Sequence, residues 1–230
     1  MVDPVNELRT DLGEERVAGT GSFRGYVPPH DYTPPMGSER RGYYGGRHII
    51  GHDSRINGGV YIGGTAREAI VVDDSRDNSS LLRDSYAKLR HAIVRTSPLR
   101  YRWRNKVPVA HALKAAYDYT QQLIPYDLDA THKITDAYPS DQKLDITKFI
   151  GGGVCRHQAL LAGYFTEKMI DEGLLNGEVH VERNSTTAGA HAWVKYTPSS
   201  GEVYFIDPAQ QFIGTAREAA SAQWDYTLPE

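Results

Sequence analysis

The sequence predicts an α+β fold, in which helices come first along the chain and antiparallel strands follow. Three segments between residues 81 and 172 repeat apolar residues at helical spacing. Three later segments, between residues 177 and 208, are rich in β-branched and aromatic residues and are separated by turn formers. We therefore expect N-terminal helices that pack on an antiparallel β-sheet.

The predicted helices are amphipathic and have clear ends. The segment 81–94 has apolar residues that would share one helix face, namely Leu82, Tyr86, Leu89 and Ile93. The segment 107–124 has Pro108 in its first turn, where proline is tolerated, and stops before Pro125. The third helix, 154–172, is followed by a glycine. A long polar connection, 127–147, separates the second and third helices.

The predicted strands form a meander. They are GEVHVERN (177–184), AHAWVKY (190–196) and EVYFIDP (202–208). TPSSGE (197–202) predicts a tight turn between the last two strands.

Residues 1–80 have a different character from residues 81–230. They contain more than half of the 22 glycines, and segments such as VPPHDYTPP consist of turn formers without helical periodicity. We expect residues 1–40 to be flexible or wrapped over the surface, and residues 47–80 to form a few short strands or a hairpin. The prediction is thus a turn-rich, partly flexible N-terminal extension, 1–80, and a folded domain, 81–230.

The composition excludes several classes of protein. The hydrophobic content of 40% and charged content of 24% are ordinary for a globular protein, and the net charge of −3 argues against a nucleic-acid or anionic-membrane partner. Neither an apolar run of about 20 residues nor a secretory signal is visible. One cysteine rules out an internal disulfide. We expect a cytoplasmic protein, although a domain of a larger or exported protein would have the same composition.

The single cysteine, Cys155, lies in GGGVCRHQALLAGY (151–164), two residues after the last of three glycines and in the first turn of the third predicted helix. A helix N-terminus favours the thiolate, which is the nucleophilic form of cysteine. The glycines would leave backbone N–H groups to hold a developing oxyanion. Small residues on the same side of the helix, Ala159, Ala162 and Gly163, would let a sheet approach closely.

A nucleophilic cysteine needs a base and a group that orients that base, and the strands contain both. His191 lies in AHAWVKY and Asp207 ends VYFIDP. If the hairpin is centred near Ser199, His191 and Asp207 face each other across the two strands, with a register uncertain by one residue. The carboxylate would then hold one imidazole nitrogen while the other nitrogen faces Cys155.

Three motifs together resemble the core of the transglutaminase-like superfamily. They are Gly-x-Cys at a helix start, His-Ala-Trp-Val-x-Tyr from His191, and Tyr-Phe-Ile-Asp-Pro ending at Pro208. Pro125-Tyr126-Asp127 also resembles the family's approach to the nucleophile. The resemblance covers about residues 107–210 and implies a papain-like fold with a Cys–His–Asp triad.

The resemblance implies that Cys155 is the nucleophile, His191 the base and acid, and Asp207 the orienting group. The implied activity is acyl transfer from peptide or side-chain amides through a thioester, without cofactor or metal. Peptidases, amidases, deamidases, protein crosslinkers and inactive relatives all occur in the superfamily, and we favour hydrolysis because water is always present. The alternatives are a protein-glutamine transglutaminase and a binding module with an idle triad. The implied partner is a protein or peptide substrate.

Several groups are candidates for the oxyanion donors. Papain relatives usually have a glutamine several residues before the cysteine, and LDITKFIGGG has none. Gly153 and the backbone of Cys155 are candidates, and a side chain from Trp103, Tyr119 or Tyr126 is another. Trp193, two residues after His191, would share its strand face and flank the site.

Other candidate residues have simpler explanations. A zinc site from Cys155, His157 and His191 lacks a fourth ligand, and Arg156 is expected in solvent. RTSPLRYRWRNK (95–106) is basic and aromatic, but we expect a solvated connection. The hexapeptide GTAREA occurs at 64–69 and at 214–219, and its Thr-x-x-Glu pattern predicts two independent helix starts. The Pro-rich stretch 27–35 could also lie across the site as an inhibitory segment.

Overall fold

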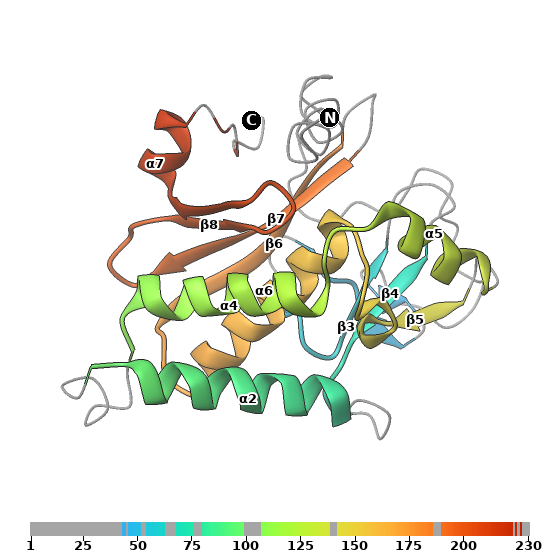
Figure 1. The fold of residues 1–230 in the computed structure, drawn as a ribbon, viewed down its shortest axis with the longest axis horizontal. Coiled ribbons are helices and arrows are strands. Elements are labelled where there is room, and N and C mark those ends of the chain that lie inside the picture. Colours follow the sequence, from blue (N-terminus) through green and yellow to red (C-terminus); the bar gives the residue numbers. More distant parts are fainter. Residues whose placement is uncertain are drawn as a thin grey trace, which may run out of the picture.

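The computed structural model describes residues 43–44, 46–51, 54–62, 68–75, 80–98, 107–138, 142–185, 190–222, 224 and 226. Within them the chain has an α+β fold, in which helices pack against a four-stranded antiparallel sheet (Figure 1). The predictions for residues 1–42, including the flexible extension and the Pro-rich stretch, lie outside the described residues.

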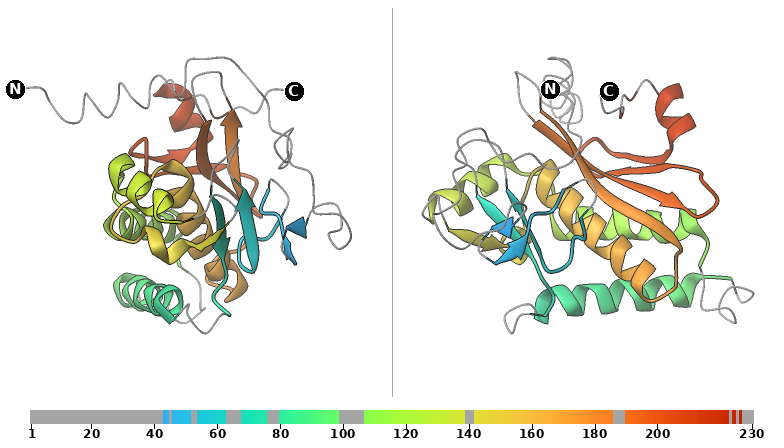
Figure 2. Two further views of the ribbon diagram at one scale, coloured as in Figure 1. Left: turned by 90° about the vertical axis from the view of Figure 1, so that its right-hand side faces the viewer. Right: turned by 180° about the vertical axis from the view of Figure 1, so that it is seen from behind.

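The four-stranded sheet consists of strands that follow one another along the chain. They are β6 (Gly177–Ser185), β7 (Ala190–Pro198), β8 (Tyr204–Asp207) and β9 (Phe212–Thr215), in that spatial order. The three predicted strands are confirmed, and so is the turn after β7, where Gly201 adopts a φ of 89°. The short strand β9 was not expected. One face of this sheet is covered by helices (Figure 2).

The three predicted helices are also confirmed. They are α2 (Ser80–Thr96), α4 (Val109–Leu123) and α6 (Cys155–Asp171). The apolar face predicted for the first helix is buried as a stripe, which comprises Leu82, Tyr86, Leu89 and Ile93. None of the described helices is long and apolar enough to cross a bilayer.

Helix α6 is the centre of the fold, because most of its side chains are buried and it contacts both the sheet and α4. The small residue Gly163 permits the predicted close approach. A Cβ at this position would lie 2.7 Å from Ile56 Cδ1 and 3.0 Å from Val181 Cγ2. Both distances are shorter than ordinary carbon–carbon contact, so glycine is required for this packing.

A second, three-stranded sheet lies beside the N-terminal half of α6. It consists of β3 (Gly59–Ile62), β4 (Ala69–Val72) and β5 (Lys143–Asp145), with β4 parallel to β5 (Figure 1). A separate hairpin is formed by β1 (Tyr43–Tyr44) and β2 (Arg47–His48). The expectation of short strands between residues 47 and 80 is therefore confirmed. Apolar residues from this region, such as Ile56 and Ile70, belong to the same core as the helices on the other side of residue 80.

Two segments differ from the predictions. The polar connection 127–147 contains a helix, α5 (Leu128–Asp136), whose N-cap Asp127 accepts a hydrogen bond from Ala130 N–H at 2.8 Å, and it also contains β5. The 3-10 helix η2 (Ile146–Phe149) follows. Thr131 is the one fully buried residue of α5, so this helix has no buried apolar stripe of the kind that α2 has.

The repeated hexapeptide forms two different structures. Its second copy begins α7 (Ala216–Ser221), in which Thr215 and Glu218 form the predicted capping box. In the first copy, Ala69 begins strand β4, so the predicted helix start is wrong there. The surrounding residues explain the difference, because Ala69 is followed by three buried β-branched residues that pair with β3.

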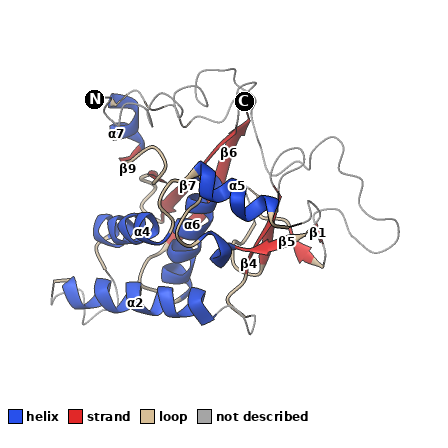
Figure 3. Ribbon diagram, turned by 45° about the vertical axis from the view of Figure 1, so that its right-hand side comes forward, coloured by secondary structure: helices blue, strands red, loops and turns tan. Residues whose placement is uncertain are grey.

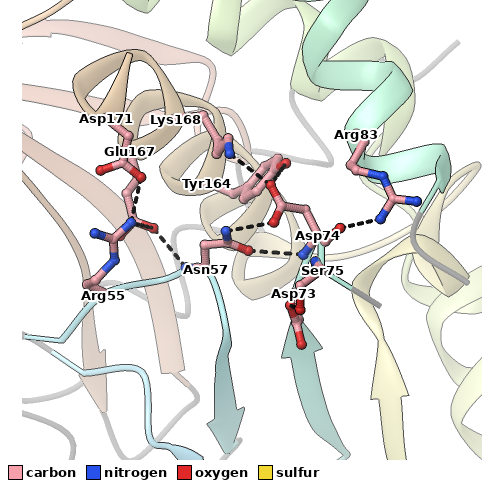
Figure 4. A network of polar contacts seen from close by, with 10 residues as sticks. All are labelled: Arg55, Asn57, Asp73, Asp74, Ser75, Arg83, Tyr164, Glu167, Lys168 and Asp171. Atoms are coloured by element: carbon pink, nitrogen blue, oxygen red, sulfur yellow. Dashed lines mark hydrogen bonds and ion pairs between the residues drawn. The ribbon is translucent and has the colours of Figure 1, made fainter. Parts of the chain in front are cut away.

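A polar network anchors the end of β4 and the loop before β3 to α6 (Figure 4). The Asp74 carboxylate accepts hydrogen bonds from Tyr164 Oη at 3.0 Å and Asn57 Nδ2 at 2.9 Å, and it pairs with Lys168 Nζ at 3.0 Å. Glu167 accepts the Asn57 backbone N–H at 2.9 Å. Since each of these acceptors has a donor, the network is explained by structure alone.

Candidate active site

Cys155 is the first residue of α6, as predicted, and only 4% of its surface is exposed. It lies at the end of α6 that approaches the start of β7 and the loop after β8. Ala209 packs against it in the same apolar cluster, and the partly buried Tyr126 packs there too. The N-terminus of α6 thus places the positive end of the helix dipole beside the sulfur.

The three glycines before Cys155 do not present their N–H groups to the site, so that expectation is wrong. Gly151 N–H donates to Leu123 O at 2.8 Å, Gly152 N–H to Phe149 O at 3.0 Å, and Gly153 N–H to Pro125 O at 3.0 Å. Gly153 is therefore excluded as a backbone oxyanion donor in this conformation.

The glycines are needed for steric reasons instead. Gly151 has a φ of 99°, which other residues rarely adopt. A Cβ at Gly152 would lie 2.5 Å from Ala130 Cβ, and a Cβ at Gly153 would lie 2.5 Å from Ile124 Cγ2. The glycine segment can therefore pack directly against the ends of α4 and α5, and this contact fixes the start of the cysteine helix.

His191 and Asp207 form a buried pair. His191 Nε2 lies 2.7 Å from Asp207 Oδ2, and the two residues are 5% and 0% exposed. The hairpin register differs from the prediction by two residues, since Val194 pairs with Ile206 and not with Tyr204. Asp207 consequently lies diagonally across from His191 rather than directly opposite, and diagonal neighbours are within reach of a histidine side chain.

The Asp207 carboxylate has two further donors. The backbone N–H of Gln210 donates to Oδ1 at 3.1 Å, and Tyr226 Oη donates to Oδ2 at 2.9 Å. A buried carboxylate with three donors is held in one orientation. The loop that follows it is tied to α4, because Gln121 Nε2 donates to the carbonyl of Pro208 at 3.1 Å.

The pKa of His191 lies well above its ordinary value. Burial of the ring acts to lower this pKa, but the charge and hydrogen bond of Asp207 raise it, and the hydrogen bond and charge of Cys155 raise it further. Nε2 is committed to Asp207, which leaves Nδ1 as the ring nitrogen for the thiol. Cys155, His191 and Asp207 are thus brought together in the described structure.

Trp193 lies on the same strand face as His191, as expected, and stacks on it with ring centroids 5.9 Å apart. Trp193 is 2% exposed. Tyr119 lies away from the site, because its ring packs on Phe165 and its hydroxyl is hydrogen bonded to Ser85 of α2. Trp103 and residues 99–106 of the basic stretch lie outside the described residues.

Arg156 was expected in solvent, and this prediction is wrong. It is 9% exposed, and its guanidinium donates to Glu68 Oε1 from Nε at 2.7 Å and from Nη2 at 2.6 Å. His157 points to the same carboxylate, with Nε2 at 3.1 Å, while its Nδ1 accepts the Val154 N–H at 3.0 Å. Burial acts to raise the pKa of Glu68, but the hydrogen bond from His157 and the charge of Arg156 lower it to about 2.

His157 is occupied by these contacts and stacks on Phe149 with ring centroids 3.6 Å apart. Its ring nitrogens are therefore committed to Glu68 and Val154 rather than to a shared site with Cys155. Among the described residues, no group of three or more histidine, cysteine, aspartate or glutamate side chains could hold a metal ion.

Comparisons with known proteins find no match to a family model, to a curated protein or to a solved structure.

Sequence reasoning missed Glu68 and Tyr226, which contact residues beside or within the predicted site. Glu68 is 88 residues from Arg156, and Tyr226 is 19 residues from Asp207. Tyr226 lies in no motif, and Glu68 was interpreted only as the glutamate of the Thr-x-x-Glu pattern in GTAREA. The one available signal for Glu68 is the unusual pair Arg156-His157, whose charge and polarity in a buried helix require an acidic partner.

Proposed function

We propose that this protein is a thiol enzyme that transfers acyl groups from peptide or side-chain amides through a thioester on Cys155. The observation that carries the proposal is the buried His191–Asp207 pair, 2.7 Å apart, beside a cysteine at a helix N-terminus. The combination contains a nucleophile, a base and a group that orients the base. The proposal includes the transglutaminase-like relationship and the papain-like architecture, which the motifs around these three residues favour.

The proposed reaction begins when Cys155 gives its proton to His191 Nδ1. The thiolate attacks the amide carbonyl carbon, and the carbonyl π electrons move to the oxygen to form an oxyanion. As the oxyanion collapses, the C–N bond breaks and His191 gives its proton to the leaving nitrogen. Water then attacks the thioester while His191 accepts its proton, and the sulfur leaves and is reprotonated. Asp207 stabilises the imidazolium in both half-reactions.

Hydrolysis is the favoured outcome because no additional binding site is needed for water. If an amine replaced water as the acceptor, the same thioester would make the enzyme a transglutaminase. The oxyanion donors of this proposal are the Cys155 backbone N–H and a second group near Tyr126, whose ring packs beside the sulfur. The proposal needs neither a cofactor nor a metal.

A specific observation favours a second candidate function, which is a binding module with an idle triad. Cys155 is only 4% exposed, and a substrate carbonyl must reach its sulfur for any reaction. If the thiol is inaccessible in solution, the same arrangement of residues would serve only to stabilise the fold.

The rate of iodoacetamide modification of Cys155 as a function of pH separates these candidates. The single cysteine makes mass-spectrometric detection of the adduct unambiguous, and Cys155→Ser is the blank. We expect the native thiol to react well below pH 7, and His191→Ala to shift the profile toward the free-thiol value of about 8.5. A native thiol that is inert, or that titrates like free cysteine in both proteins, would overturn the enzyme proposal. Screening with peptide amides and glutamine donors, with and without an added amine, then identifies the acyl acceptor.

A further inference from the structure

The chain beyond α7 returns to the face of the four-stranded sheet that carries His191. Tyr226 is 6% exposed, and its ring lies against three aromatic side chains of that face, with centroid distances of 4.5 Å to Phe205, 5.4 Å to Trp193 and 5.7 Å to Phe212. The backbone N–H of Trp224 donates to Ala219 O at 2.8 Å, which ties this return to α7. The aromatic packing thus fixes where the hydroxyl of Tyr226 lies.

That hydroxyl donates to Asp207 Oδ2, the same oxygen that accepts from His191 Nε2. We propose that Tyr226 is a positioning residue of the Cys155 site, which shares Asp207 Oδ2 with His191 and so limits how strongly the carboxylate attracts the imidazolium. This inference rests on the proposed function of Cys155. It assigns part of the site to a C-terminal segment that lies outside the three motifs of the superfamily resemblance.

The ring and the hydroxyl of Tyr226 have separable roles. The ring buries apolar surface on Trp193 and Phe205, which a phenylalanine would do equally well. Packing alone does not require a hydroxyl, and a buried hydroxyl costs free energy unless it is hydrogen bonded. The O–H dipole has its positive end on Oδ2, so it offsets part of the carboxylate charge that His191 experiences.

This offset matters for the proposed reaction because His191 must both accept and release a proton. An imidazolium that is held too strongly is a poor acid toward the leaving nitrogen. Asp207 is 0% exposed and water cannot screen it, so a neighbouring hydroxyl is an available means of moderating its charge. Gln210 N–H is bound to the other oxygen and does not compete with His191.

Among the described residues, several other titratable groups surround His191. Cys155 of α6 and Asp207 of β8 act on it directly. On its own sheet face, Glu182 of β6 pairs with Lys195 of β7 at 3.3 Å. From α4, Tyr117 lies near enough to Asp207 for the carboxylate charge to raise the Tyr117 pKa, although burial is the main cause of that increase. Conservative change at Tyr226 leaves all of these groups in place.

The test is the pH profile of Cys155 alkylation in Tyr226→Phe. A thiolate–imidazolium pair gives two steps, in which the lower step reports thiolate formation and the upper step reports loss of the imidazolium proton. Removing the hydroxyl strengthens the attraction of Asp207 for the imidazolium, so we expect the upper step to move up by about half to one pH unit. The matched control is Tyr204→Phe, because the Tyr204 hydroxyl donates to Glu202 on the exposed turn and not to the site.

Each outcome has a definite meaning. An upper step raised in Tyr226→Phe and unchanged in Tyr204→Phe supports the proposal. A Tyr226→Phe profile that matches the native one, or an upper step that moves down, overturns it while leaving the proposed function intact. A native protein whose thiol titrates like free cysteine overturns the proposed function and this inference together. Urea unfolding midpoints check the fold, and Tyr226→Met, which also lacks the hydroxyl, must shift the upper step in the same direction.

Discussion

Replacing Glu68 by glutamine removes the carboxylate that holds the first turn of the cysteine helix. Glu68 is 7% exposed, and it binds both the Arg156 guanidinium and His157. Its pKa falls from the usual 4.5 to about 2 in the folded protein. At about 1.4 kcal/mol per pH unit, this change corresponds to a contribution of about 3 kcal/mol to the free energy of unfolding at neutral pH. The variant also leaves a buried guanidinium without its anion, so we expect a total loss of about 3 to 5 kcal/mol.

The pH dependence follows from the direction of the shift. A carboxyl group whose pKa is lowered by folding stabilises the protein above its unfolded pKa, and that stability is lost as the pH falls toward the folded value. The native protein should therefore lose stability as the pH falls from about 4.5 toward about 2 through this one group. Glu68→Gln has no such group, so the difference in the free energy of unfolding between the two proteins should become smaller in acid.

The assay is urea unfolding followed by tryptophan fluorescence at pH 7 and at pH 3. The matched control is Asp118→Asn, which breaks the exposed pair between Lys114 and Asp118, 2.5 Å apart on α4. Exposed pairs of this kind contribute about 0.5 kcal/mol or less, so the free energy of unfolding of the control should remain close to that of the native protein. A loss of less than about 1 kcal/mol in Glu68→Gln at pH 7, or a loss that is the same at both pH values, would refute the reasoning.

Three other predictions test the site and the fold. Asp207→Asn should lower the pKa of His191. The charged pair should therefore stabilise the native protein most below pH 6.5, and this stabilisation should disappear as the pH rises through the raised His191 pKa. If the free energy of unfolding depends on pH in the same way in both proteins, this prediction is contradicted. Gly153→Ala should cost about 1 to 3 kcal/mol in urea, since its Cβ would lie 2.5 Å from Ile124 Cγ2; an unchanged midpoint would disprove the steric role. Deletion of residues 1–79 should abolish the cooperative transition and the native circular dichroism, because buried core residues such as Ile70 are lost with it; a stable, cooperative product would show that the core closes without them.

The sequence predicted the parts of the fold that depend on local pattern. Helix α2 was predicted because its apolar stripe has helical spacing, and strand β7 because its segment is rich in β-branched and aromatic residues and is followed by turn formers. The same local patterns placed Cys155, His191 and Asp207 at the ends of the elements that bring them together. The pairing register was off by two residues because a turn sequence does not by itself determine where the ladder begins.

The parts that sequence reasoning missed depend on contacts between distant segments. Residues 64–69 and 214–219 have identical sequences, yet Ala69 begins a strand because β3 and β5 flank it on either side. The glycines before Cys155 were expected to expose N–H groups, but those groups bind carbonyls from the end of α4, from the α4–α5 connection and from η2. A local motif identifies the residue types at a site, whereas their hydrogen-bond partners are decided by tertiary packing.

The contacts around Cys155 show how its position is determined from two sides. On one side, Glu68 binds the two residues after the cysteine, and Gly153 binds the connection before α5. On the other side, Asp207 is held by its own loop and by Tyr226. A thiol enzyme needs this fixed geometry, because displacements of about 1 Å can reduce the rate about 100-fold. An idle module has no need to tune an imidazolium, so a Tyr226 hydroxyl that measurably shifts the His191 proton would itself favour the enzyme over the module.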